Sequence, residues 1–222
     1  MELPPDLKRT LRALMLRELG NYTFDYFEIE LFEWYVQETE KVLNEMATAE
    51  HSYIQKQVAS DVPELNDSGL VAVDYFARRI RYSHVIYLTS LLETSLERAC
   101  STLSRAVGEE NIPFRLGELS GDQWSRRRRF LERYGRFELP ADLWSELKVL
   151  IKVRNYLVHE NGSTAKLDEK LRNRLTKCVG LDVSSYEFRI EDAFVKQAFE
   201  HVRSFVAVVE ERVLSASVHE SR

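Results

Sequence analysis

Residues 83–103 read SHVIYLTSLLETSLERACSTL, and their apolar side chains recur every three or four positions. This spacing predicts an α-helix that turns one apolar face toward a core. The recurring residues are Val85, Leu88, Leu92, Leu96, Ala99 and Leu103. Since no glycine or proline interrupts residues 70–107, the pattern predicts one long helix over that range.

The rest of the chain has the same character, with only 8 glycines and 5 prolines in 222 residues. We therefore expect an all-α fold, an antiparallel bundle of helices with short connections. Residues 184–190, SSYEFRI, have strand character but no evident partner strand. The expected helices are a short one at the N-terminus and helices over 26–58, 70–107, 122–134, 141–160, 168–178 and 191–215.

In the 26–58 helix, the carboxylates have a helical period and are expected on the outer face. Its aromatic residues are expected to pack inward. These are Phe27, Phe32, Trp34 and Tyr35.

Composition excludes several classes of site. Cys100 and Cys178 form no CxxC pair, so neither a zinc site nor a disulfide framework is expected, and no metal or cofactor is predicted. The sequence has no apolar run of about 18 residues and no signal peptide, so we expect a cytoplasmic protein that does not enter a membrane.

Charge is distributed unevenly around a net value of -5. Residues 1–65 hold 13 acidic and 6 basic side chains, whereas residues 115–136 hold 3 acidic and 7 basic ones. A polyanion such as RNA is expected at the second region, because phosphate contacts are made by Lys and Arg. The candidate RNA-binding residues are Arg126, Arg127, Arg128, Arg129 and Arg133.

Two interpretations of this basic segment stay open. In one, its arginines form a solvated helix face above buried aromatic residues; in the other, they form a surface that follows phosphates and stacks bases. Four consecutive arginines sweep most of a helix circumference, so they cannot all contact one strand. The interleaved aromatic residues are Trp124, Phe130 and Tyr134.

Residues 154–162, RNYLVHENG, close the helix predicted over 141–160. At about 100° per residue, Arg154 falls about 20° from Leu147 and so lies inside the apolar stripe. A guanidinium there is costly unless it meets an acid, a phosphate or a partner chain. Asn155 and His159 are four residues apart and can touch. The stripe consists of Leu143, Leu147, Leu150, Ile151, Leu157 and Val158.

Spacing alone leaves two roles open for this motif. In a structural role, Arg154 pairs with a buried carboxylate such as Glu93 or Glu97. His159 then only caps the last turn, where a positive charge interacts favourably with the helix dipole. In a functional role, both groups are directed at phosphate, because the guanidinium fork fits it and an imidazole transfers protons near neutral pH.

The stretch RNYLVH resembles the signature of HEPN-family ribonucleases, in which an arginine, a polar residue and three variable residues precede a histidine. The preceding segment SHVIYLTSLLETSLERAC and the final FRIEDAFVKQAFEHVRSFVAVVEERV are also similar, so the resemblance spans roughly residues 70–212. It implies an HEPN-type bundle over 69–215. Residues 1–68 would then be a helical extension packed on this core, and 216–222 a flexible tail.

The resemblance also implies an activity. HEPN ribonucleases cleave RNA without a metal, by attack of the 2'-hydroxyl on the adjacent phosphate, and leave a cyclic phosphate. By the same resemblance Arg154 supplies charge, His159 transfers protons, Asn155 orients, and Glu93 on the preceding helix supports the site.

Members of the family form homodimers in which two motifs line one cleft, and they act in toxin–antitoxin or phage-defence systems with an antitoxin or defence partner protein. Some members carry a tyrosine two residues after the histidine, which a partner nucleotidyltransferase modifies; here that position is Asn161. The alternative function is a helical interaction or nucleotide-binding module without catalysis, with the acidic residues 1–65 as a docking surface.

Overall fold

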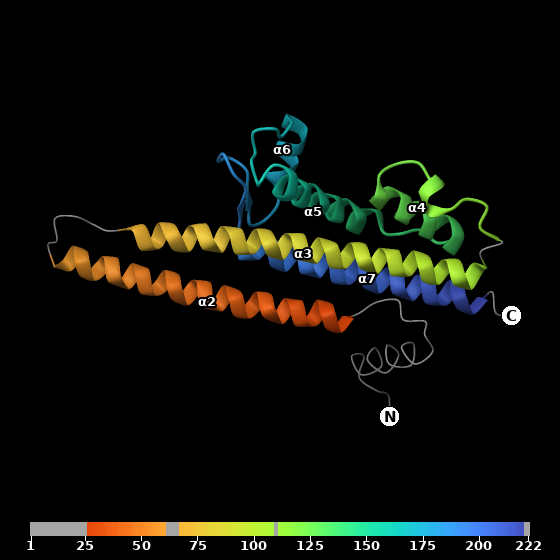
Figure 1. Cartoon of the computed structure of the whole chain (residues 1–222), viewed down its shortest axis with the longest axis horizontal. Coiled ribbons are helices and arrows are strands. Elements are labelled where there is room, and N and C mark those ends of the chain that lie inside the picture. The colour runs from red at the N-terminus through yellow and green to blue at the C-terminus, as the bar shows by residue number, and fades with distance from the viewer. Residues whose placement is uncertain (1–25, 61–66, 109–110, 220–222) are drawn as a thin grey trace, which may run out of the picture. The chain divides into compact units, whose positions relative to one another are not determined.

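The computed structural model describes residues 26–60, 67–108 and 111–219 (Figure 1). The predicted all-α class is confirmed, and the ends of the described helices lie within four residues of the predicted ones. The predicted N-terminal helix lies outside the described residues. No helix in the described ranges is long and apolar enough to cross a membrane. The helices are α2 Tyr26–Ala59, α3 Ser68–Val107, α4 Gln123–Gly135, α5 Ala141–His159, α6 Glu169–Leu175 and α7 Asp192–His219, with a 3-10 turn, η2, at Leu116–Glu118.

The apolar row of α3 is buried as its spacing predicts. Each of its six members is at most 1% exposed. The helix therefore forms because one continuous face can be removed from water, and the hydrophobic effect contributes about 25 cal/mol per Å² of apolar surface that it buries.

A short hairpin corrects one expectation. The strand β2, Arg189–Ile190, does have a partner, because it pairs antiparallel with β1, Leu181–Asp182. Leu181 lies opposite Ile190, and both are buried. Each strand has two residues, so neither could show the alternation by which strands are recognised in a sequence.

The described chain forms two compact units. The motif unit consists of Glu28–Thr89 and Lys148–Glu200, and the arginine unit of Ser90–Leu147 and the helical residues from His201 onward. Helices α3, α5 and α7 each contribute one part to each unit. The predicted domain boundary at residue 68 stays a prediction, whereas the helix α7 continues beyond residue 215, to His219.

In the motif unit, Phe32 of α2 packs against Phe199 of α7, with 5.4 Å between ring centroids. Arg81 of α3 holds Glu40 of α2 through two bonds, of 2.8 Å from Nε and 2.6 Å from Nη2. Glu40 is only 4% exposed, so its carboxylate does not lie on the outer face as predicted. A buried carboxylate is tolerated here because a bidentate arginine supplies both charge and hydrogen bonds.

The aromatic residues of α2 also differ from expectation. Trp34 is 58% exposed and Tyr35 is 52% exposed, whereas Phe32 is buried. Trp34 lies about 200° around the helix from Phe32, so the two cannot face one core. The row that does face the core is Ile29, Phe32, Val36, Glu40 and Leu43.

His84 of α3 is a buried polar group in this unit. It is 1% exposed, and neither ring nitrogen has a hydrogen-bond partner among the described residues. Its ring lies edge-on to Phe32, with 5.9 Å between centroids. Burial lowers the pKa of this imidazole, and the nearby Arg81 lowers it further, against the opposing effect of the Glu40 and Asp192 carboxylates.

We expect acidification to destabilise the motif unit through His84. Because the pKa is lowered in the folded state, the unfolded chain takes up the proton first. The free energy of unfolding therefore falls as the pH drops below the ordinary histidine value of about 6.5, by at most about 1.4 kcal/mol per pH unit. Urea unfolding of the wild type and of His84→Phe between about pH 5 and 7.5 measures this. The variant should have a shallower pH dependence, and parallel curves for the two proteins would contradict the assignment.

Candidate functional site

The chain leaves α5 through a turn fixed by backbone geometry. Asn161 and Gly162 have φ angles of 51° and 77°, in the left-handed region, so the helix cannot continue. The Gly162 N–H donates to the Tyr156 carbonyl over 3.0 Å, and the Phe188 N–H donates to the Gly162 carbonyl over 2.9 Å. A Cβ at Gly162 would lie 2.6 Å from the Tyr82 ring. Gly162 therefore lies just after the end of α5, where a side chain would not fit.

The apolar stripe of α5 is only partly as predicted. Four of its members are buried, but Leu143 is half-buried and Val158 is 44% exposed. In the last two turns the core contact is made by Val153, 0% exposed, and Leu157, 5% exposed. The buried face therefore turns away from Arg154 and Val158 toward the end of the helix. The four buried members are Leu147, Leu150, Ile151 and Leu157.

Arg154 is half-buried and has no carboxylate partner among the described residues. Its Nη1 donates to Asn155 Oδ1 over 3.2 Å. The two carboxylates proposed for its structural role, Glu93 and Glu97, instead bind Arg127. Within the described residues, Arg154 therefore does not form the buried ion pair that its structural role would require.

His159 is the last residue of α5 and is exposed. Asn155 lies four residues, about one turn, before His159, so the two side chains are neighbours on the helix surface. Since the Arg154 guanidinium bonds to Asn155, it is drawn around the helix toward the side of His159. The open face at the helix end consists of Arg154, Asn155, Val158 and His159, which are half-buried or exposed. Arg154 and His159 lie about 140° apart around the helix, and Arg154 contacts Asn155, the neighbour of His159.

A second guanidinium lies at the turn after His159 and was not predicted. Arg79 Nη1 donates to Asn161 Oδ1 over 3.4 Å, and its Nη2 lies 3.4 Å from Glu187 Oε1. The only sequence signal is the run ARRIR at 77–81, which looks like an ordinary charged helix face. Asn161 is held by this contact.

In the arginine unit, Arg127 has a structural role. It is 4% exposed, with Nη1 3.4 Å from Glu93 Oε1 and Nη2 3.3 Å from Glu97 Oε2. Glu93 also accepts a hydrogen bond from Gln123 Nε2. These contacts hold α4 against α3. Arg127 is therefore not accessible for the predicted RNA binding. The described contacts of Glu93 are made with α4 and not with Arg154.

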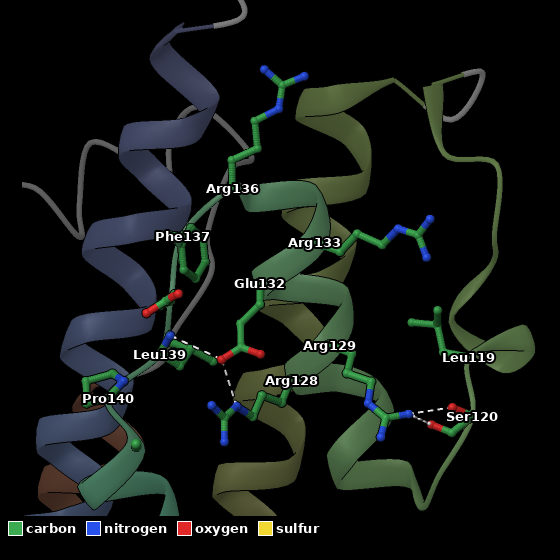
Figure 2. A pocket seen from close by; sticks show the side chains of 12 residues that line it. Leu119, Ser120, Arg128, Arg129, Glu132, Arg133, Arg136, Phe137, Leu139 and Pro140 are labelled. Atoms are coloured by element: carbon green, nitrogen blue, oxygen red, sulfur yellow. Dashed lines mark hydrogen bonds and ion pairs between the residues drawn. The ribbon is translucent and has the colours of Figure 1, made fainter.

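Arg128 is neutralised locally. Its Nε donates to Glu132 Oε1 over 2.8 Å (Figure 2). Its guanidinium carbon lies 5.4 Å from the centroid of the Trp144 ring. Glu132 Oε1 also accepts the Leu139 N–H over 3.3 Å. The predicted role of Arg128 in RNA binding would require breaking this pair.

Arg126, Arg129 and Arg133 lie at positions i, i+3 and i+7, which share one face of a helix. Arg126 Nη1 donates to the Gly117 carbonyl over 3.5 Å. Arg129 Nη1 donates to the carbonyl and hydroxyl oxygens of Ser120 over 2.6 Å and 2.5 Å. Within the described residues none of the three makes an ion pair, so their charges stay available to an anion.

Figure 2 shows how these side chains divide around α4. Arg129 and Arg133 extend toward the side of Leu119 and Ser120, whereas Arg128 and Glu132 extend toward Leu139. The side chains labelled in Figure 2 line a pocket of about 1150 Å³. Its charged lining residues are Arg128, Arg129, Glu132, Arg133, Arg136 and Glu138.

The interleaved aromatic residues divide as well. Phe130 is 4% exposed and belongs to the core, whereas Trp124 and Tyr134 are half-buried. Among the described residues, no three His, Cys, Asp or Glu side chains are grouped so that they could hold a metal ion. Comparisons of the chain with protein-family models, with curated proteins and with solved structures gave no match.

We expect substitutions of the α4 arginines to differ in how much they lower the free energy of unfolding. Arg127→Ala removes the buried guanidinium that bridges Glu93 and Glu97 and should lower the free energy of unfolding by about 2–4 kcal/mol. Arg126→Ala, the matched variant one position earlier, should change it by no more than about 0.5 kcal/mol. Urea unfolding measures both, and equal losses in the two variants would show that Arg127 has no special structural role.

Proposed function

We propose that the chain is a metal-independent endoribonuclease of HEPN type, in which the α5 ends of two copies form one cleavage site. The observation that supports this most is the state of Arg154. A half-buried guanidinium without a carboxylate is available to a phosphate, and its bond to Asn155 directs it toward the side of His159.

The proposed reaction needs only groups of this kind. The 2'-hydroxyl oxygen attacks the adjacent phosphorus, the new 2'-oxygen–phosphorus bond forms, and the bond from phosphorus to the 5'-oxygen breaks. One imidazole takes the proton of the 2'-hydroxyl and another gives a proton to the leaving 5'-oxygen. The guanidinium stabilises the charge that develops on the phosphorane, a type of contribution worth about 10²- to 10³-fold in rate.

A second copy supplies what one copy lacks. One chain offers a single His159 at the helix end, whereas the reaction uses both a base and an acid. A two-fold axis beside α5 would bring a second His159 and a second Arg154 to the same phosphate. This arrangement would cover the exposed Val158.

The alternative function is a helical interaction module without catalysis. It draws support from α2, whose exposed side chains include Leu31 at 51%, Trp34 at 58% and Tyr35 at 52%. A group of exposed apolar side chains is typical of a surface that contacts another protein. The two functions differ in whether purified protein generates new RNA ends.

We expect Arg154→Ala and His159→Ala each to slow RNA cleavage by about 100-fold or more, because each removes a group that acts on the reacting phosphate. The assay follows a synthetic oligoribonucleotide in EDTA and identifies cyclic phosphate ends by mass spectrometry.

Arg189→Ala and His51→Ala are the matched controls, because both residues are exposed and lie in the same unit but outside α5. Both control variants should cleave at the wild-type rate. Undiminished cleavage by Arg154→Ala and His159→Ala would exclude the proposed site, and loss of wild-type cleavage on adding EDTA would exclude the metal-free reaction.

A further inference from the structure

An irregular segment lies along α4 and is fastened to it at three points. Tyr134 Oη donates to the Phe114 carbonyl and accepts the Phe114 N–H, each over 3.2 Å. Arg126 holds Gly117, and Arg129 holds Ser120, at the 3.5 Å and 2.6 Å distances given above. The segment 114–120 is therefore fixed relative to the arginine face of α4.

An exposed aromatic ring lies within this cationic surface. Phe114 is 44% exposed. The guanidinium carbon of Arg133 lies 4.9 Å from the centroid of the Phe114 ring and 5.8 Å from that of Tyr134. The contact orients the guanidinium against the ring, and it leaves Arg133 exposed and without an ion pair among the described residues. An aromatic ring and a guanidinium held together in this way can stack on a nucleobase.

Basic side chains outnumber acidic ones in residues 115–136, by 7 to 3. Glu118 accepts the Arg115 N–H over 2.9 Å, and Asp122 caps α4 by accepting the Ser125 N–H over 2.7 Å. Both carboxylates are thus engaged by backbone groups, whereas Arg129 and Arg133 project from the same side of the helix (Figure 2).

We propose that Phe114 and Arg133 form a stacking platform for one unpaired base of single-stranded RNA, with Arg126 and Arg129 contacting its phosphates. Duplex RNA would gain less, because its bases are paired and stacked and cannot reach Phe114. This inference rests on the proposed ribonuclease activity only for the nature of the polyanion, since the platform and the α5 motif lie in different units and are tested by different measurements.

Fluorescence anisotropy tests this with a labelled oligoribonucleotide of about 12 nucleotides, offered single-stranded and as a duplex of the same sequence. The protein carries His159→Ala, and EDTA is present, so that the probe stays intact. We expect tighter binding of the single strand. Phe114→Ala should weaken it by about 10-fold, in line with the loss of one stacked base, and Phe114→Trp should retain it.

Arg129→Ala should weaken binding of both forms of the probe and lower the dependence of affinity on salt, because one phosphate contact is lost. Arg212→Ala, an exposed arginine of α7 in the same unit, is the control and should bind as the parent protein does.

Equal affinity for duplex and single strand, or an unchanged affinity in Phe114→Ala, would overturn the platform. Circular dichroism and thermal unfolding of each variant establish that it is folded. Single-strand binding that depends on Phe114, in a wild-type protein that fails to cleave, would support this inference and refute the proposed function. RNA cleavage by the wild type, with single-strand binding unchanged in Phe114→Ala, would support the proposed function and refute this inference.

Discussion

A guanidinium that is buried or half-buried needs a counter-charge, and this need organises the helix contacts of the molecule. Where the chain supplies carboxylates, the arginine builds the fold: Arg81 holds Glu40 between α3 and α2, and Arg127 holds Glu93 and Glu97 between α4 and α3. Removing one partner of such a pair is costly, so these arginines are fixed by folding. Arg154 has no carboxylate partner in the described chain, and the hydrogen bond that holds its guanidinium goes to Asn155 of the same motif.

The long helices could be predicted from the sequence because each has enough turns for its apolar row to repeat. Shorter or locally determined features could not. The two-residue strands at Leu181 and Arg189 are too short for a pattern, and the turn of the buried face along α5, which exposes Val158, depends on which neighbours the helix meets. Arg127 could not be told from Arg126 in a run of four arginines, because only packing decides which one faces α3.

The candidate site was predicted in its residue types but not in its surroundings. Spacing predicted that Asn155 and His159 are neighbours, whereas it placed Arg154 about 140° from His159 around the helix. Arg79 at the following turn and Phe114 come from segments that carry no motif. The proposed account assigns cleavage to the motif unit and the capture of single-stranded RNA to the arginine unit. Helices α3, α5 and α7 contribute residues to both units and would join the two activities in one chain.

The central claim is that the open faces of two α5 helices meet. Oxidative cross-linking of Val158→Cys tests it directly, since residues beside a two-fold axis lie near their own copies and a disulfide needs Cα atoms within about 7 Å. The background carries Cys178→Ser, and Cys100 is buried, which raises the pKa of its thiol to about 12. The account predicts a covalent dimer from Val158→Cys and none from Val179→Cys, a control that is 63% exposed in the same unit. A Val158→Cys protein that cleaves RNA yet stays monomeric on oxidation, or equal cross-linking by both variants, would contradict it.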